Sequence, residues 1–135
     1  MGLEIRERER EGIHILDVKG RLTVGEEIGM LREKLTGMAA AGMANVILNM
    51  KDVDYIDSTG LGGMVMCFTA MKKAGGALKL LQLSRRNIEL LVLTKLTTVF
   101  ELHNEEQDAV NSFFPDRDIK KFDILSFVQK QKEGQ

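Results

Sequence analysis

The 135-residue chain has few of the residues that mark several protein classes. Its one cysteine, Cys67, cannot close an internal disulfide, which excludes a disulfide-stapled secreted scaffold. Tryptophan is absent and aromatic residues make up 5% of the chain, which argues against a base-stacking platform for nucleic acid. The single proline, Pro115, lies close to the C-terminus and fits a boundary after a helix.

Long apolar runs and an excess of one charge are also missing. No run approaches the roughly 20 apolar residues that span a bilayer, and the N-terminal MGLEIRERER turns charged at once, so we expect neither membrane insertion nor a signal peptide. With 19 basic and 20 acidic residues the formal net charge is -1, so we expect no nucleic-acid partner. Hydrophobic residues make up 44% of the chain, which is enough for the core of one domain. Without a signal peptide or disulfides, we expect this domain to be cytoplasmic.

Strand and helix patterns alternate along the chain and predict an α/β fold. A hairpin opens it, and we expect a mixed, mostly parallel sheet of about five strands packed with about four helices. Residues 20–23 and 51–60 read as loops. The predicted strands are 3–10, 13–19, 45–50, 77–81 and 97–102; the predicted helices are 25–41, Leu61 to Gly75, the segment after Ser84, and 105–114.

Residues 115–135 form a predicted C-terminal extension to a domain of residues 1–114. Apolar residues recur in it every three positions, which is typical of a short amphipathic helix: Ile119, Phe122, Leu125 and Val128. Because an isolated short helix is marginal in water, this one needs a surface to pack on. We expect it to dock on its own domain; a partner interface is the alternative.

The segment from Asp54 to Gly63 carries the functional information. It follows a central strand and opens a helix, and in open α/β sheets such loops gather functional groups at the carboxyl ends of strands. Asp57 or Ser58 can cap the helix, and the three glycines keep its first turn thin enough for a partner backbone to approach. A helix cap alone would explain Asp57 and Ser58 without any function.

The position of Ser58 also suits a charge switch. A phosphate on a helix N-terminus meets a partial positive charge of roughly half a unit and free N–H donors, so the domain would tolerate it. Nearby Asp52, Asp54 and Asp57 predict an acidic outward surface. Phosphorylation would add roughly 1.5 to 2 negative charges, which would repel a partner that accepts the neutral hydroxyl.

The string DSTGLGG, after a strand and an acidic turn, resembles the signature of the STAS domain, the family of anti-sigma factor antagonists. The resemblance includes the element order, the Gly20-Arg21-Leu22 turn and the pattern from Leu93 to Phe100. It covers about residues 3–114. It implies a small partner-switching protein with no catalysis of its own and no cofactor, and it leaves homodimer formation open.

The resemblance also implies roles for individual residues. Ser58 would be the phosphoacceptor of a serine kinase that is itself the anti-sigma factor, with Thr59 a less favoured acceptor. A PP2C-type phosphatase would reset it. The partner-binding residues would be Thr23, Asp57, Ser58, Thr59, Gly60, Leu61 and Gly62. Thr23 departs from the family's G-x-L-D turn, which bears on partner identity.

Other functions are weaker readings of the same residues. A hydrolase would need a base beside Ser58, but G-x-S-x-G is absent and the histidines are only His14 and His103. One cysteine and two histidines without paired spacing make a poor metal site. Nucleotide binding lacks the P-loop lysine. An alternative function is that of a docking subunit in a larger complex, either stressosome-like or in lipid transport. Met64, Met66 and Met71 could form a partner surface, although such residues more often fill a core.

Overall fold

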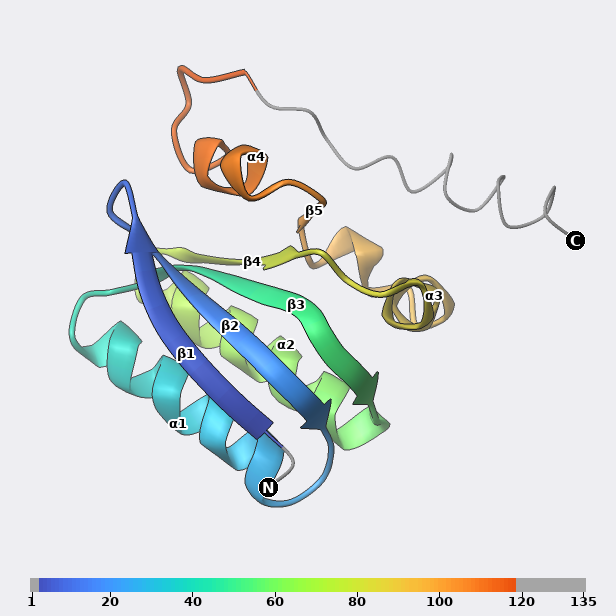
Figure 1. The fold of residues 1–135 in the computed structure, drawn as a ribbon. Helices are drawn as coiled ribbons and strands as arrows, with labels where there is room; N and C mark the ends of the chain where they lie inside the picture. Colours follow the sequence, from blue (N-terminus) through green and yellow to red (C-terminus); the bar gives the residue numbers. More distant parts are fainter. Residues whose placement is uncertain (1–2, 119–135) are drawn as a thin grey trace, which may run out of the picture.

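The computed structural model describes residues 3–118. Its elements alternate in the predicted order, with a single-turn 3-10 helix added before the last strand (Figure 1). The strands are β1 (Leu3–Arg10), β2 (Ile13–Leu22), β3 (Asn45–Ile56), β4 (Ala77–Leu81) and β5 (Leu102–His103). The helices are α1 (Glu26–Ala40), α2 (Ser58–Lys73), α3 (Arg85–Leu93) and α4 (Glu106–Asn111), with the 3-10 helix η1 at Leu96–Thr98.

The five strands form one sheet in the order β1-β2-β3-β4-β5. Strands β1 and β2 pair antiparallel and the other neighbours pair parallel, which confirms the predicted mixed sheet and its opening hairpin. The hairpin turns through Glu11 and Gly12, whose φ angles of 54° and 85° are both positive. This is the two-residue turn whose twist matches that of the flanking strands.

Helices α1 and α2 lie side by side on one face of the sheet, and α4 lies on the other (Figure 1). The main core fills the space under α1 and α2, where Leu16 and Leu48 of the central strands are fully buried. A smaller cluster under α4 includes Ile15 and Ile47, which immediately precede Leu16 and Leu48 on the same two strands. Alternate residues thus serve opposite faces, as a sheet covered on both sides requires.

Two predicted loops are wrong because they continue strands. Residues 20–22 extend β2, and residues 51–56 extend β3, where they pair with the end of β2 from Lys19–Asp52 to Leu22–Ile56. Two irregularities in the β2–β3 register break the strict alternation of side chains. Val53 and Ile56 are buried, whereas Asp52, Asp54 and Tyr55 are exposed. The polar composition of this segment predicted a loop, but the residues form a strand with one buried side.

The predicted strand at 97–102 is also wrong. Residues Leu96–Thr98 form η1, and only Leu102 and His103 join the sheet, opposite Leu80 and Leu81 of β4. The run of β-branched residues favours a strand locally, but Phe100 is buried in the main core, and this tertiary contact prevails over propensity. The last helix is shorter than predicted, Glu106–Asn111 instead of 105–114.

Charged side chains fasten α4 to the hairpin. Arg8 bridges Asp17 of β2 and Glu106 of α4, with its Nε 2.7 Å from Asp17 Oδ2 and its Nη1 3.0 Å from Glu106 Oε2. Arg117 reaches Glu11 at the hairpin turn, 2.8 Å from Nη2 to Oε1. Most of the predicted extension, residues 119–135, lies outside the described residues. Within 3–118, no helix is long and apolar enough to cross a bilayer.

Candidate functional site

Ser58 is the first residue of α2 and is separated from Ile56, the last residue of β3, by Asp57 alone. Of the two predicted caps, Asp57 is the one used: its backbone is extended, with φ −92° and ψ 178°, and its side chain accepts a hydrogen bond from the helix. Ser58 and Thr59 are both exposed. The hydroxyl of Ser58 therefore stands at the N-terminal, partially positive end of a 16-residue helix.

The carboxylate of Asp57 joins two segments. Its Oδ1 accepts from the backbone N–H of Gly60 at 2.7 Å, and its Oδ2 accepts from the backbone N–H of Val24 at 3.0 Å. Hydrogen bonds from Gly60 first and Val24 second hold the pKa of Asp57 below its ordinary value. The Asp57 carboxylate thus accepts hydrogen bonds from these two N–H groups, whereas Asp52 and Asp54, the other two residues of the predicted acidic surface, are exposed.

The three glycines of the DSTGLGG signature have different surroundings. A Cβ on Gly60 would come within 2.0 Å of the Leu22 carbonyl oxygen, and one on Gly63 within 2.2 Å of Ile28 Cγ1. Gly62 is exposed, and a Cβ there would meet nothing within 4 Å. Gly60 and Gly63 are therefore required by internal packing, whereas the fold itself places no such demand on Gly62.

The predicted partner-binding residues divide between surface and core. Ser58, Thr59 and Gly62 are exposed together on the first turns of α2. Leu61, 6% exposed, is in the main core, and Gly60 is buried against the backbone of Leu22, so neither presents a side chain to a partner. Sequence reasoning did not include Val24, whose side chain is 66% exposed and whose N–H is bonded to Asp57. An apolar residue between two turn residues, Thr23 and Gly25, was the signal that could have identified it.

Thr23 lies half-buried in the segment between β2 and α1. Its hydroxyl donates to Glu27 Oε1 at 3.0 Å, across the first turn of α1. The acidic side chain nearest to Thr23 in these contacts is therefore Glu27, four residues later in the chain. Thr23 and Asp57 lie at the same end of the sheet because they follow Leu22 and Ile56, which are paired between β2 and β3, and the Val24 N–H then bonds to Asp57.

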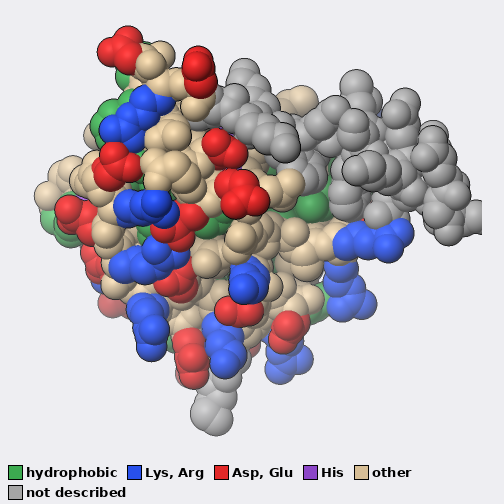
Figure 2. Space-filling view, turned by 45° about the horizontal axis from the view of Figure 1, so that its top comes forward, with side chains coloured by type: hydrophobic (Ala, Val, Ile, Leu, Met, Phe, Trp, Pro, Cys, Tyr) green, Lys and Arg blue, Asp and Glu red, His purple; other side chains and the backbone are tan. Residues whose placement is uncertain are grey.

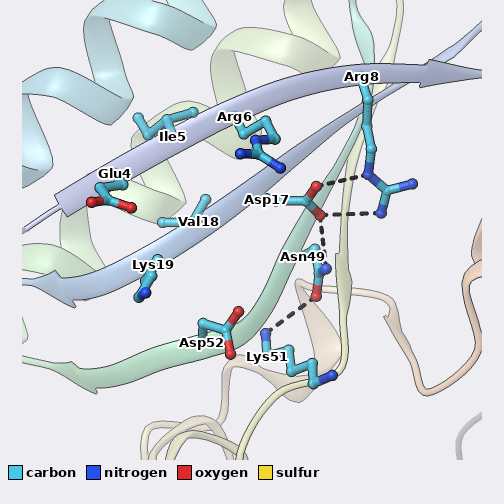
Figure 3. Close-up of a pocket in the computed structure, with 10 residues that line it drawn as sticks. All are labelled: Glu4, Ile5, Arg6, Arg8, Asp17, Val18, Lys19, Asn49, Lys51 and Asp52. Atoms are coloured by element: carbon cyan, nitrogen blue, oxygen red, sulfur yellow. Dashed lines mark hydrogen bonds and ion pairs between the residues drawn. The ribbon is translucent and has the colours of Figure 1, made fainter.

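A hollow of about 680 Å³ lies away from Ser58, lined by residues of β1, β2 and β3 (Figure 3). Arg6, Lys19 and Lys51 alternate there with Glu4 and Asp52, and the Asn49 amide donates to Asp17 Oδ1 at 2.8 Å. Figure 2 shows the same interspersion of basic and acidic side chains over one face, without a patch of a single sign. Because opposite charges are interleaved, the hollow selects no sign of ligand, and no predicted site residue lines it.

The other predicted candidates fall into the core or its edge. Cys67 is buried, and burial raises the pKa of its thiol to about 11, so it is inert. Met64 and Met71 are also buried, while Met66 is 53% exposed. His103 is buried in β5, and its Nε2 lies 2.6 Å from Glu101 Oε2. This nitrogen is therefore paired with Glu101 and does not act as a base for Ser58. Within residues 3–118 no His, Cys, Asp and Glu side chains group as metal ligands.

Comparison with known proteins agrees with this geometry. Over 110 residues the chain is 36% identical to the anti-sigma-B factor antagonist of Bacillus subtilis strain 168, covering 82% of this chain and 99% of that protein. A putative anti-sigma factor antagonist of Thermotoga maritima superposes with a TM-score of 0.71 at 18% identity, covering 81% of this chain and 93% of that one.

The Bacillus cell fate determinant SpoIIAA, solved in its phosphorylated form, superposes with a TM-score of 0.63 at 16% identity over 81% of this chain and 98% of that one. At such identities these two structures show a shared fold. The sequence profile described as "STAS domain" matches residues 4–109, which include β1 from its second residue, β2 to β5, α1 to α3 and the whole signature loop. On this match and that of the Bacillus subtilis relative, the chain belongs to the STAS domain family.

Proposed function

We propose that this protein is an anti-sigma factor antagonist that switches partners through phosphorylation of Ser58. In the unmodified state it binds an anti-sigma factor with serine kinase activity and thereby draws that factor away from sigma. The kinase transfers the terminal phosphate of ATP to the Ser58 oxygen, ADP leaves, the hydroxyl proton is lost, and the complex dissociates. A PP2C-type phosphatase restores the hydroxyl. The whole cycle takes place in the bacterial cytoplasm.

The observation that carries the proposal is the exposed hydroxyl of Ser58 at the start of α2. A kinase reaches this oxygen without any unfolding, and the phosphate would lie where the helix N-terminus favours an anion. The domain is therefore expected to remain folded in both states. The name of the Bacillus subtilis relative, which is matched over almost its full length, supports the same partner class.

The phosphate would act on the partner and leave the domain's shape unchanged. Ser58 and Thr59 are neutral and exposed, and the exposed apolar Val24 is joined through its backbone N–H to Asp57, the residue that precedes them. A surface of this kind fits a partner that also presents neutral groups. Adding roughly 1.5 to 2 negative charges at its centre would force the partner to desolvate a charge that it cannot pair. Affinity should fall although no backbone moves.

Phosphate transfer is tested with the purified anti-sigma factor of the same organism. The protein is incubated with that factor and ATP, and the product is mapped by mass spectrometry. We expect one phosphate, on Ser58, and none in Ser58→Ala, which should still bind. Thr59→Ala is the matched control and should be phosphorylated like the wild type. Phosphate confined to another residue, or binding that is indifferent to phosphate, would favour a docking subunit of a larger assembly.

A further inference from the structure

The second half of β3 has a partner strand on one side only. Strand β4 ends at Leu81, which pairs with Asn49, so residues 50–56 of β3 run on past the last pairing with β4. On its other side β3 continues to pair with β2 up to its last residue. Ser58 lies two residues beyond this stretch. Among the strands of residues 3–118, β2 alone therefore holds the end of β3 that carries Ser58.

The first turn of α3 takes the place of the missing strand. Figure 1 shows α3 beside this end of β3, past the end of β4. Asn87 of α3 donates from its Nδ2 to the Val53 carbonyl oxygen at 3.1 Å, and the Asn87 residue is only 1% exposed. One residue earlier, the Arg86 guanidinium lies 5.6 Å from the centre of the Tyr55 ring. Helix α3 thus contacts the open side of β3 at Val53 and again at Tyr55.

These two contacts flank an irregularity in the strand. Val53 and Tyr55 pair with consecutive residues of β2, so Asp54 between them has no residue opposite. A bulge of this kind bends its strand and redirects the side chains near it. Ser58 follows Asp54 by four residues. Since the bulge sets the direction in which β3 ends, the contacts from α3 bear on where Ser58 is placed.

Stability alone does not explain an asparagine at position 87. The Asn87 Oδ1 is buried and has no hydrogen-bond partner among the described residues. An unpaired buried polar atom costs more than one neutral hydrogen bond usually gains. The cap of α3 does not need the amide either, because Ser84 Oγ caps this helix by accepting the Asn87 backbone N–H at 3.2 Å. The feature that the amide does supply is the bond to Val53 at the bulge.

We propose that Asn87 is a positioning residue for phosphate transfer to Ser58. This inference rests on the proposed function. In that transfer the Ser58 oxygen bonds to the terminal phosphorus of ATP, the bond from that phosphorus to ADP breaks, and the hydroxyl proton is lost. The rate depends on how closely the oxygen is aligned with the phosphate. By bonding Val53, Asn87 fixes the end of β3 on the side away from β2 and so fixes the Ser58 oxygen.

Asn87→Leu separates positioning from stability. Leucine fills a similar volume and removes the unpaired Oδ1 together with the donor, so the melting temperature should fall by only about 2–4 °C. The kcat for phosphorylation of Ser58 by the purified anti-sigma factor of the same organism should fall about tenfold, because the hydroxyl is less well aligned. The KM for this protein should stay within about twofold, since the exposed contact surface is unchanged.

Val110→Ala supplies the matched control. Val110 is fully buried in the small cluster under α4, away from Ser58. Its truncation should lower the melting temperature at least as much as Asn87→Leu does, because it leaves a cavity. The kcat for Ser58 should nevertheless equal that of the wild type. An equal fall in kcat in both variants would overturn the proposal, because loss of stability alone would then account for the slower transfer.

Amide hydrogen exchange of the full-length chain tests the same contact without a kinase. The amides of residues 53–57 should exchange faster in Asn87→Leu than in the wild type. Unchanged protection of these amides, or a wild-type kcat in Asn87→Leu, would overturn this inference and leave the proposed function intact. A wild-type chain that takes up no phosphate on Ser58 would overturn the proposed function, and this inference with it.

Discussion

Gly60 of α2 lies directly against the backbone of Leu22 at the end of β2, with a space between them that admits no Cβ: the added atom would be 2.0 Å from the Leu22 carbonyl oxygen. The same oxygen accepts the backbone N–H of Asp57 at 3.2 Å. The signature loop is therefore fitted to the end of β2 by backbone alone. This fit fixes the direction in which α2 leaves the sheet and so the position of Ser58.

Gly60→Ala should be strongly destabilising. Its methyl group would meet a carbonyl oxygen held in the sheet, which cannot rotate away as a side chain could, so α2 must shift. We expect a loss of about 3 kcal/mol in the free energy of unfolding, measured by urea denaturation. Gly62→Ala is the control, since open space surrounds that position. Equal stability of the two variants would show that α2 is not seated on Leu22.

Substitution of Asp57 should separate its two hydrogen bonds. Asp57→Asn keeps an oxygen for the Gly60 N–H but offers an NH₂ group to Val24, whereas Asp57→Ala loses both bonds. Melting temperatures at pH 7 should therefore fall in the order wild type, Asp57→Asn, Asp57→Ala, with several degrees between the first and last. If Asp57→Ala melts like the wild type, the carboxylate does not hold the two segments together.

The Asp57 bonds should also weaken in acid. The pKa of this carboxyl is lowered by the Gly60 and Val24 N–H groups, so folding favours the ionised form. Its contribution is complete above the ordinary aspartate pKa of about 3.9 and is lost as the pH falls through the lower folded value. The gap in melting temperature between wild type and Asp57→Asn should narrow from about pH 4 downward. A constant gap from pH 7 to pH 2.5 would contradict this account.

Glu106 fastens α4 to the hairpin through two arginines. Its pKa is lowered first by Arg8, which lies 2.5 Å away, and then by Arg10 at 2.7 Å, against an opposing effect of burial. Glu106→Gln should lose about 1 kcal/mol of stability at neutral pH, a modest figure because these groups are partly exposed. The exposed neighbour variant Glu105→Gln is the control and should unfold like the wild type.

The Glu106 effect should have a defined pH range. Because folding lowers its pKa, the stability it contributes is present above the ordinary glutamate value of about 4.3 and disappears as the pH falls through the folded value. Urea denaturation at a series of pH values should show wild type and Glu106→Gln converging below about pH 4. A difference that persists unchanged at pH 3 would mean that packing, not charge, accounts for it.

The spacing of apolar residues correctly predicted the helices that bury a single side. In α1, the spacing of Ile28, Leu31 and Leu35 gave the helix and its buried side, and the structure buries all three. The prediction failed where the pattern depends on partners far along the chain. The second half of β3 is polar on its open side, so only its pairing with β2 reveals it as a strand.

The candidate site divides in the same way. The cap by Asp57 and the exposure of Ser58 follow from local chemistry, since a short acidic side chain before a helix has a known partner in the first turn. The bond from the Val24 N–H to Asp57 joins residues 33 positions apart, and no local pattern encodes it. The burial of Leu61 follows from the spacing of apolar residues along α2, which also includes the buried Met64 and Met71.

Lys79 of β4 offers a test of how α4 is held from the opposite side. The Lys79 ammonium, only 11% exposed, donates to the Ser112 carbonyl oxygen at 3.0 Å and lies 3.1 Å from Glu101 Oε2 and 4.3 Å from the centre of the Phe113 ring. Lys79→Met keeps the aliphatic stem but leaves the Ser112 carbonyl and the Glu101 carboxylate without this partner. We expect about 1–2 kcal/mol lower stability.

Hydrogen exchange should locate this loss in α4. In Lys79→Met the amides of Ala109 and Val110, which are fully buried against β2 to β4, should exchange faster than in the wild type, because the segment after them is released. Lys72→Met on the exposed side of α2 is the control and should leave α4 protected. If α4 keeps its protection in Lys79→Met, the buried apolar contacts of Ala109 and Val110 suffice to hold the helix, and the lysine serves only to neutralise Glu101.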